Sequence, residues 1–158
     1  MLNKITPFLW FETQAEEAAL FYTSIFKDSK MGNISRYPEE AVEVSGKAAG
    51  SVMTASFELE GLEFTALNGG PLFKFSEAIS FQVSCKDQAE IDYFWEKLTE
   101  GGEESQCGWL KDKFGLSWQI VPEGMGEIMG GGDPAKSGRA MKAMLEMKKL
   151  DIDTLKNA

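Results

Sequence analysis

The residue types in this chain of 158 residues exclude several common kinds of catalysis. The chain contains no histidine, so Ser-His-Asp and Cys-His arrangements, the usual base near neutral pH and the usual imidazole metal ligand are all absent. Carboxylates, lysines, tyrosines and two cysteines remain. Glu58 and Asp112 could each act as a base, but no spacing pairs either with a second acid. Asp112 also lies in an expected turn, where aspartate is favoured.

Cys107, directly before Gly108 and Trp109, could be a reactive thiol. A reactive thiolate needs nearby positive charge or a helix N-terminus. Lysines lie close in sequence, but the sequence does not show that one reaches the sulfur. We therefore favour a thiol that packs as a small apolar side chain. Trp109 and Trp118 could stack on a planar ligand or pack in the core.

Two glycine-containing segments could hold an anionic group. Asn68-Gly69-Gly70 could form a nest of backbone amides, and turn chemistry explains it equally well. Gly124-Met125-Gly126 follows an expected strand that ends at Val121, as a nucleotide-type S-adenosylmethionine site requires. No parallel return strand is expected after it. We therefore expect no cofactor.

An internal duplication organises the elements that must position these residues. Gln14-Ala15-Glu16 recurs as Gln88-Ala89-Glu90, an offset of 74 residues. Each copy follows an apolar strand, Ile5 to Phe11 in the first half and Ile79 to Cys85 in the second. Because the strand-cap-helix order is shared as well, the repeat indicates two similar modules.

Each copy of the repeat also predicts a helix start. Thr13 with Glu16 has the spacing of a capping box, and Asp87 with Glu90 resembles one. Apolar residues then recur at helical spacing, which is typical of a helix that packs on a core. The first stripe is Ala15, Ala18, Ala19, Tyr22, Ile25 and Phe26, and the second is Ile91, Phe94, Trp95 and Leu98.

Strands are expected after each helix, so that each half has the order β-α-β-β-β. In the first half, Glu60-Gly61 predicts a tight hairpin turn between two strands of alternating pattern. The expected segments are a strand over 31–37, a loop over 38–50, strands over 53–59 and 62–66, and, in the second half, strands over 109–111 and 116–120.

The tail from residue 123 onward lies outside the duplication. Asp133-Pro134 is a good N-cap and first-turn pair, and Ala140, Met141, Met144 and Leu145 predict a helical stripe. The methionines could cover a pocket or a partner chain, and packing onto the body is favoured. We expect one domain over 1–158, with a first module at about 1–70, a second at about 71–122 and a helical tail at about 123–158.

The composition limits the partners. With 16 Lys+Arg and 25 Asp+Glu the formal charge is −9, which disfavours nucleic acid and anionic membrane surfaces. No apolar run reaches the roughly 18 residues of a membrane span, and Met1-Leu2-Asn3-Lys4 leads into no signal-peptide core. Two cysteines are too few for a disulfide scaffold, so we expect a cytoplasmic protein.

Six segments, spread over nearly the whole chain, form a specific combination. They are ITPFLWF (5–11), AEEAA with FY (15–22), LNGGP (67–71), QCGWLKD (106–112), FGLSWQIVP (114–122) and MLEMKKLD (144–151). Two fused β-α-β-β-β modules resemble the vicinal oxygen chelate superfamily, which includes glyoxalase I, bleomycin-resistance proteins and extradiol dioxygenases. The six segments are similar to its PhnB-like family, which is labelled 3-demethylubiquinone-9 3-methyltransferase.

This resemblance implies a mixed α+β fold in which the two modules form an open, barrel-like sheet with a concave pocket, followed by the helical tail. Metal-dependent relatives carry ligands, usually His or Glu, at positions that fall here on Pro7, near Ala66, on Ala78 and on Gln119. Three of these side chains cannot ligate, and a lone amide is a weak site, so we expect no metal. Because relatives commonly pair, a homodimer is also expected.

If the lost metal positions face inward, strand alternation selects a mostly apolar lining with a few polar groups. Such a cup suits a small aromatic or amphipathic ligand; a collapsed core is the alternative. The predicted inward-facing set is Pro7, Leu9, Phe11, Phe64, Ala66, Asn68, Ala78, Ser80, Gln82, Ser117 and Gln119. The predicted ligand-binding residues are Phe11, Phe64, Asn68, Ser80, Gln82, Cys107, Trp109 and Gln119.

Three hypotheses for function follow. The first is a metal-free binder of a small molecule. The second is an enzyme of the same fold that acts on a quinone- or phenol-type substrate, including the labelled methyl transfer; no catalytic residue is predicted. The third is a structural protein whose cup is filled by its own side chains. A pocket of at least ~300 Å³ would separate the first two from the third.

Overall fold

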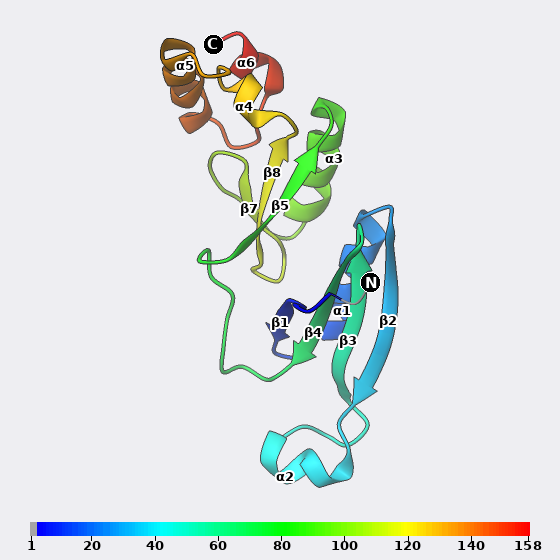
Figure 1. Ribbon diagram of the computed structural model, residues 1–158. Helices are drawn as coiled ribbons and strands as arrows, with labels where there is room; N and C mark the ends of the chain where they lie inside the picture. Colours follow the sequence, from blue (N-terminus) through cyan, green and yellow to red (C-terminus); the bar gives the residue numbers. More distant parts are fainter. Residues whose placement is uncertain (1–2) are drawn as a thin grey trace. The chain divides into compact units, whose positions relative to one another are not determined.

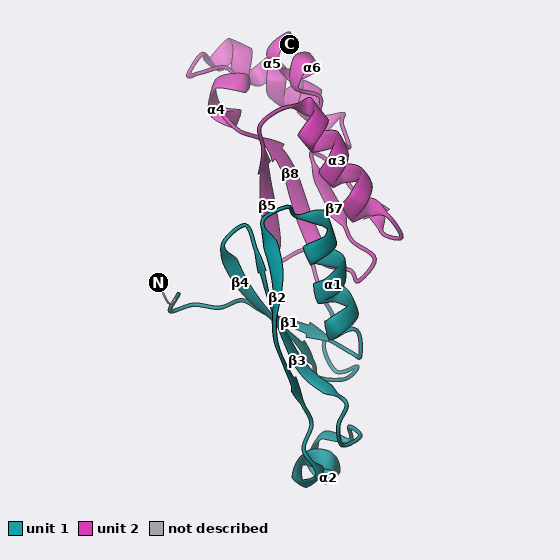
Figure 2. Cartoon of the chain, turned by 90° about the vertical axis from the view of Figure 1, so that its right-hand side faces the viewer, with its two compact units in different colours: residues 1–74 teal, residues 75–158 magenta. Residues whose placement is uncertain are grey.

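A computed structural model describes residues 3–158 of the chain. The chain divides between Lys74 and Phe75 into two units, unit 1 and unit 2 (Figure 2). Met1 and Leu2, which begin the expected first module and the segment considered as a signal peptide, lie outside the described residues. No helix within residues 3–158 is long and apolar enough to cross a membrane.

Unit 1 is a four-stranded sheet with one long helix on one face (Figure 1). The strand order is β1-β4-β3-β2, with β1 parallel to β4 and the other pairs antiparallel. The order along the chain confirms the expected β-α-β-β-β module. Its elements are β1 (Phe8–Phe11), α1 (Ala15–Ile25), β2 (Ser29–Arg36), η1 (Glu39–Ala41), α2 (Val42–Ser45), β3 (Val52–Leu59) and β4 (Leu62–Asn68). The segment expected to be a loop therefore contains two short helical turns.

The core of unit 1 lies between α1 and the sheet. Alanines let the helix approach the strands closely, and Ala18 and Ala19 are completely buried. Tyr22 of α1 stacks on Phe57 of β3, with ring centroids 5.9 Å apart, and Phe57 stacks on Phe64 of β4 at 5.2 Å. These contacts confirm the predicted apolar stripe of the first helix.

The hairpin between β3 and β4 turns at the residues predicted for it. Glu60 and Gly61 have φ angles of 48° and 83°, so both central residues occupy the left-handed region that a type I′ turn requires. Leu59 pairs with Leu62 directly before and after the turn. The local sequence was therefore sufficient to predict both the turn and its register.

The predicted capping box at the start of α1 is wrong. The N-cap residue is Gln14, and no side chain of that segment caps the helix. Instead the backbone N–H of Ala15 donates to Oδ1 of Asn68, 2.8 Å away at the end of β4. Since a residue 53 positions along the chain supplies the cap, a local motif could not reveal it.

Unit 2 repeats the topology of unit 1. Its strand order is β5-β8-β7-β6, with β5 parallel to β8, so each strand matches its counterpart in the order β1-β4-β3-β2. The elements are β5 (Ser80–Cys85), α3 (Gln88–Thr99), β6 (Glu103–Glu104), β7 (Trp109–Lys111), β8 (Ser117–Pro122), α4 (Met125–Ile128), α5 (Pro134–Leu145) and α6 (Ile152–Lys156). This equivalence agrees with the repeat, and within residues 3–158 neither sheet closes into a barrel.

Helix α3 begins as its sequence predicts. The side chain of Asp87 accepts a hydrogen bond of 2.9 Å from the backbone N–H of Glu90, and the Glu90 carboxylate accepts one of 2.7 Å from the N–H of Lys86. This arrangement satisfies helix-end donors as a capping box does, with the second acceptor moved by one residue. The predicted stripe residues Ile91, Phe94, Trp95 and Leu98 are all buried.

The C-terminal helices pack onto unit 2 around Ile128, Leu150 and Leu155. Asp133 caps α5 as predicted, accepting from the N–H of Ala135 at 3.0 Å.

The predicted apolar stripe of α5 is only partly correct. Ala140 is buried, but Met141 and Leu145 are 46% and 62% exposed. Met144, which was also predicted, packs on the Ile128 cluster together with Ala143, which was not.

Candidate functional site

The two faces of the sheet in unit 2 have different roles. Helix α3 covers one face, where Leu110, Trp118 and Ile120 are buried. Strand alternation places Gln82 and Gln119 on the opposite face, where they are direct neighbours across β5 and β8. That face is the floor of a pocket.

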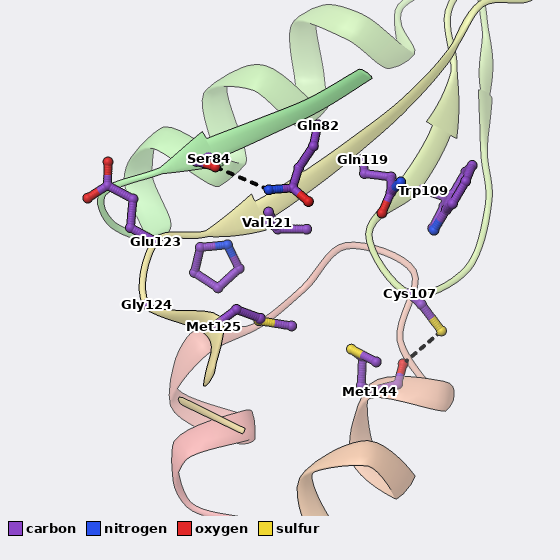
Figure 3. Close-up of a pocket in the computed structure, with 11 residues that line it drawn as sticks. Gln82, Ser84, Cys107, Trp109, Gln119, Val121, Glu123, Gly124, Met125 and Met144 are labelled. Carbon is purple, nitrogen blue, oxygen red and sulfur yellow. Dashed lines mark hydrogen bonds between the residues drawn. The ribbon is translucent and has the colours of Figure 1, made fainter. Parts of the chain in front are cut away.

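The pocket has a volume of about 410 Å³ and lies between the sheet and the C-terminal helices (Figure 3). Figure 3 shows the side chains of β5 and β8 on one side and Met125 and Met144 on the other. The pocket is therefore partly polar on its sheet side and has thioether groups on its helical side. It is lined by Gln82, Ser84, Cys107, Trp109, Gln119, Val121, Pro122, Glu123, Gly124, Met125 and Met144.

The amide side chains of the floor are held by neighbouring serines. Nε2 of Gln119 donates to Oγ of Ser80 at 2.9 Å, and Nε2 of Gln82 donates to Oγ of Ser84 at 3.3 Å. The predicted residue Ser80 therefore does not line the pocket itself, but orients an amide that does. The hydroxyl of Ser117 on the same face is buried and has no hydrogen-bond partner among the described residues.

Cys107 borders the pocket in a constrained backbone position. Its φ angle is 59°, and its N–H donates to the carbonyl of Met147 at 2.8 Å. The thiol donates to the carbonyl of Met144 at 3.5 Å. Gly108 follows, and its N–H donates to the carbonyl of Lys148 at 2.8 Å. The loop that carries Cys107 thus fastens the tail to the rest of unit 2, and the thiol of Cys107 already has a hydrogen-bond partner.

The expected orientation of the residues in unit 1 is wrong. Phe11, Phe64 and Asn68 point toward α1, together with Leu9 and Ala66, and all five are buried. The ring of Phe64 belongs to the core stack described above, and both groups of the Asn68 amide are bonded within unit 1.

Asn68 does border a second hollow, of about 330 Å³, beside the start of α1. Its carbonyl oxygen accepts from Ala15, and its Nδ2 donates to the carbonyl of Val52 at 3.1 Å. The amide is therefore occupied by structural bonds. We assign no ligand to this hollow.

The duplication contained the signal that would have corrected the orientation. At the offset of 74 residues, Gln82 corresponds to Phe8 and Cys85 to Phe11. If Gln82 faces the open side, Phe8 must do so as well, and Phe11 must face the helix. Accordingly Phe8 is 63% exposed and Phe11 is buried.

Sequence reasoning also missed part of the pocket lining. Ser84 and Val121 have the alternation phase of Gln82 and Gln119, so their presence could have been deduced. Met125 and Met144 come from the tail, whose methionines were considered as a cover for a pocket while packing onto the body was favoured, and their place at the pocket depends on how the tail docks.

Several other candidate groups have structural roles. The carboxylate of Asp112 accepts from the N–H groups of Phe114 and Leu116 at 2.9 and 3.1 Å and from Nε1 of Trp118 at 2.9 Å. Glu58 lies 3.7 Å from the ammonium of Lys30 on an exposed surface. Neither carboxylate lies at the pocket, so the structure supports neither as a base there.

The Asn68-Gly69-Gly70 segment is covered rather than open to an anion. Nε1 of Trp10 donates to the carbonyl of Gly70 at 2.9 Å. A Cβ at Gly69 would lie 2.3 Å from the indole ring, so the ring rests directly on this backbone. The glycine is required by close packing.

The donor set does not fit the metal chemistry of the wider superfamily. Of the four expected positions, only Gln119 carries a possible ligand, and its amide nitrogen is bonded to Ser80. Within residues 3–158 no group of three or more His, Cys, Asp or Glu side chains could hold a metal ion.

The glycines after β8 also do not form a doubly wound nucleotide site. Gly124 is the N-cap of α4, a helix of four residues, and no strand follows it in the described chain. A nucleotide-type S-adenosylmethionine site of that kind needs a strand–turn–helix followed by a parallel strand. Gly124 and Gly126 therefore do not form an S-adenosylmethionine site of this kind.

The paired β-α-β-β-β units, each with a helix packed on one face of its sheet, define a fold of the glyoxalase/bleomycin-resistance type. A fosfomycin resistance protein, FosX, from Listeria monocytogenes shares this fold, with a TM-score of 0.52 and 12% identity over 80% of this chain and 98% of the other. A protein from Pseudomonas aeruginosa does so with a TM-score of 0.61 and 19% identity over 77% and 98%.

A closer similarity shows the family. The family described as 3-demethylubiquinone-9 3-methyltransferase matches residues 3–121. A PhnB protein from Bacillus cereus with the same methyltransferase description is 39% identical, over 76% of this chain and 99% of the other, with a TM-score of 0.67. The chain belongs to this PhnB-like family. No curated protein matches it, and helices α4 to α6 follow the matched residues.

Proposed function

We propose that the pocket of unit 2 binds a small, uncharged and partly apolar molecule without a metal ion. The observation that carries this proposal is the pocket itself, whose volume of about 410 Å³ falls within the range of small-molecule sites. Its combination of a few amide groups with apolar and thioether side chains is also typical of such sites.

The groups around the pocket support binding rather than catalysis. Its ionisable lining residues are Cys107 and Glu123. The thiol of Cys107 donates a hydrogen bond to the carbonyl of Met144. General acid–base catalysis needs a titratable group within reach of the proton that it moves. The amides of Gln82 and Gln119 can orient a ligand, but they do not titrate.

An enzyme acting on a quinone- or phenol-type substrate is the second candidate. The observation in its favour is the methyltransferase description shared by the family and the Bacillus cereus relative. Methyl transfer requires a methyl donor, so this candidate predicts binding of S-adenosylmethionine. Saturable binding of that compound, or turnover of a quinol in its presence, would favour the enzyme over the binder.

The proposal is tested by native mass spectrometry of protein purified without added metal or ligand, followed by a thermal-shift screen of small aromatic and amphipathic compounds. We expect apo mass with no stoichiometric transition metal and stabilisation by some compounds. Val121→Trp should fill the pocket and abolish this stabilisation. Met141→Trp, on the exposed side of α5, is the control. A stoichiometric transition metal, or hits that bind the Val121 variant equally well, would contradict the proposal.

We also propose that the chain forms a homodimer in the cytoplasm. In support of the dimer, Phe8, Leu72 and Phe73 of unit 1 are exposed apolar side chains, and exposed apolar patches often mark interfaces. In support of the location, Cys85 and Cys107 are both free thiols, as expected in a reducing compartment. The same native mass spectra report the number of subunits.

A further inference from the structure

The amide oxygens at the floor of the pocket lack donors. The nitrogens of Gln82 and Gln119 are bonded to Ser84 and Ser80, and since an amide is planar, each of these bonds fixes the direction of the oxygen. Among residues 3–158, no group donates to Oε1 of either glutamine. Figure 3 shows both oxygens on the cavity side of their strands, with that of Gln82 near Val121 and that of Gln119 toward Trp109. The floor therefore offers two oriented hydrogen-bond acceptors.

Trp109 adds one donor beside these acceptors. It is the direct cross-strand neighbour of Gln119, and it lines the same pocket. Its Nε1–H has no acceptor within the described chain. A hydroxyl group both donates and accepts, so it can donate to an amide oxygen and accept from the indole. A carbonyl or ether oxygen can accept from the indole, but it has no hydrogen to donate to either amide oxygen.

The side of the pocket formed by the two methionines favours a ligand with a flat, apolar ring. Met125 and Met144 stand opposite the glutamines (Figure 3), and thioether sulfur makes favourable contacts with aromatic rings. Glu123 at the pocket and the net charge of −9 disfavour an anionic ligand. The pocket should therefore bind neutral molecules more tightly than carboxylates or phosphates.

We propose that this pocket selects a neutral hydroxylated aromatic molecule, with its hydroxyl groups donating to Oε1 of Gln82 and Gln119 and its ring against Met125 and Met144. The inference rests on the proposed function and specifies the class of ligand. It makes Gln82 and Gln119 the residues that determine specificity. The oxidised or O-methylated counterpart of the same ring is rejected, because it leaves both amide oxygens without a donor.

The test compares two compounds of the same shape by isothermal titration calorimetry, 2,7-dihydroxynaphthalene and 2,7-dimethoxynaphthalene. The diol should bind at least about tenfold more tightly, which corresponds to one lost hydrogen bond of ordinary strength. Gln82→Leu and Gln119→Leu should each weaken the diol by about that factor and leave the dimethyl ether nearly unchanged. Gln106→Leu, an exposed glutamine outside the pocket, is the matched control.

The other possible results of these binding experiments each contradict a specific part of the inference. Because the side chain of Gln82 is exposed, its replacement should not disturb folding, which circular dichroism checks. Equal affinities for the two compounds in the unchanged protein would overturn the selection of hydroxyl groups while leaving a pocket that binds small molecules. Diol binding that survives both substitutions would also overturn it. If neither compound binds, the inference falls, and the thermal-shift screen then decides the proposed function separately.

Discussion

Oδ1 of Asn68 accepts the backbone N–H of Ala15 at 2.8 Å, so the last residue of β4 caps the first turn of α1. The other half of the same amide donates to the carbonyl of Val52, the first residue of β3, at 3.1 Å. One buried side chain therefore joins three elements of unit 1. Asn68 was expected to bind a ligand, and the structure instead uses both of its polar groups to hold the helix on the sheet.

Replacing Asn68 should destabilise unit 1. Asn68→Ala removes the acceptor for Ala15 and the Nδ2 donor to the partly buried carbonyl of Val52, which should lower the free energy of unfolding by roughly 1–3 kcal/mol. Asn68→Asp keeps an acceptor for Ala15 but sets a buried carboxylate oxygen against the carbonyl of Val52, so it should not restore the stability. Chemical denaturation measures both. An unchanged free energy of unfolding in Asn68→Ala would contradict this joining role.

Asp112 should act as a structural anchor and not as a base. Asp112→Ala leaves three donors without their acceptor, the Nε1–H of Trp118 among them, so the free energy of unfolding should fall by roughly 2–4 kcal/mol. Asp133→Ala, which removes an exposed helix cap, should cost only about 1 kcal/mol. Denaturation monitored by tryptophan fluorescence compares the two. A smaller loss at Asp112 than at Asp133 would contradict the anchoring role.

Gln88 should hold the tail against the rest of unit 2. Its Nε2 donates to the carbonyl of Leu150 at 3.0 Å, and its Oε1 accepts from the N–H of Ile152 at 2.9 Å. Gln88→Ala should therefore speed hydrogen exchange in residues 147–155 and weaken ligand binding, because Met144 belongs to the pocket wall.

The control for Gln88 is Lys149→Ala. It removes the exposed ion pair with Asp92, in which the two charged atoms are 2.8 Å apart. Exposed pairs contribute about 1 kcal/mol or less, so exchange in the tail should hardly change. Unaltered exchange in the Gln88 variant would show that the apolar cluster alone fastens the tail.

The buried thiol of Cys85 should make the stability of unit 2 depend on pH in the alkaline range. Burial, followed by the nearby carboxylates of Glu90 and Asp87, raises the pKa of Cys85 to about 12 from 9.0. The unfolded chain then loses this proton at lower pH than the folded chain. The stabilisation is fully present below pH 9 and is lost as the pH rises toward 12.

This dependence can be measured by comparing variants at two pH values. Between pH 8 and pH 10, Cys85 should account for a loss of roughly 1 kcal/mol in the free energy of unfolding. Cys85→Ala should remove that part of the loss. Val83→Ala, on the same strand, should lower stability equally at both pH values. The same pH dependence in the Cys85 variant would assign the loss to other groups.

Several elements could be predicted because their causes are local. The β3–β4 turn needs two residues that tolerate positive φ, and Glu60-Gly61 provides them. Asp87 and Asp133 cap helices with donors two or three residues away. The repeat at residues 14 and 88 also predicted that the two units share one topology, since similar patterns fold in similar ways.

The sequence by itself predicted the two β-α-β-β-β modules, the order of their main strands and helices, and the family, but not the short elements η1, α2, β6, α4 and α6. Gln82, Cys107, Trp109 and Gln119, which were selected from the sequence, line the pocket of unit 2, and their binding of a ligand stays a prediction. Strand alternation separates two sets of side chains, but it does not say which set faces the helix. That choice depends on how α1 packs, so Phe64 and Asn68 were assigned to the wrong face. Only the tertiary structure brought Met144 to the pocket, because docking of the tail depends on contacts between residues far apart in sequence.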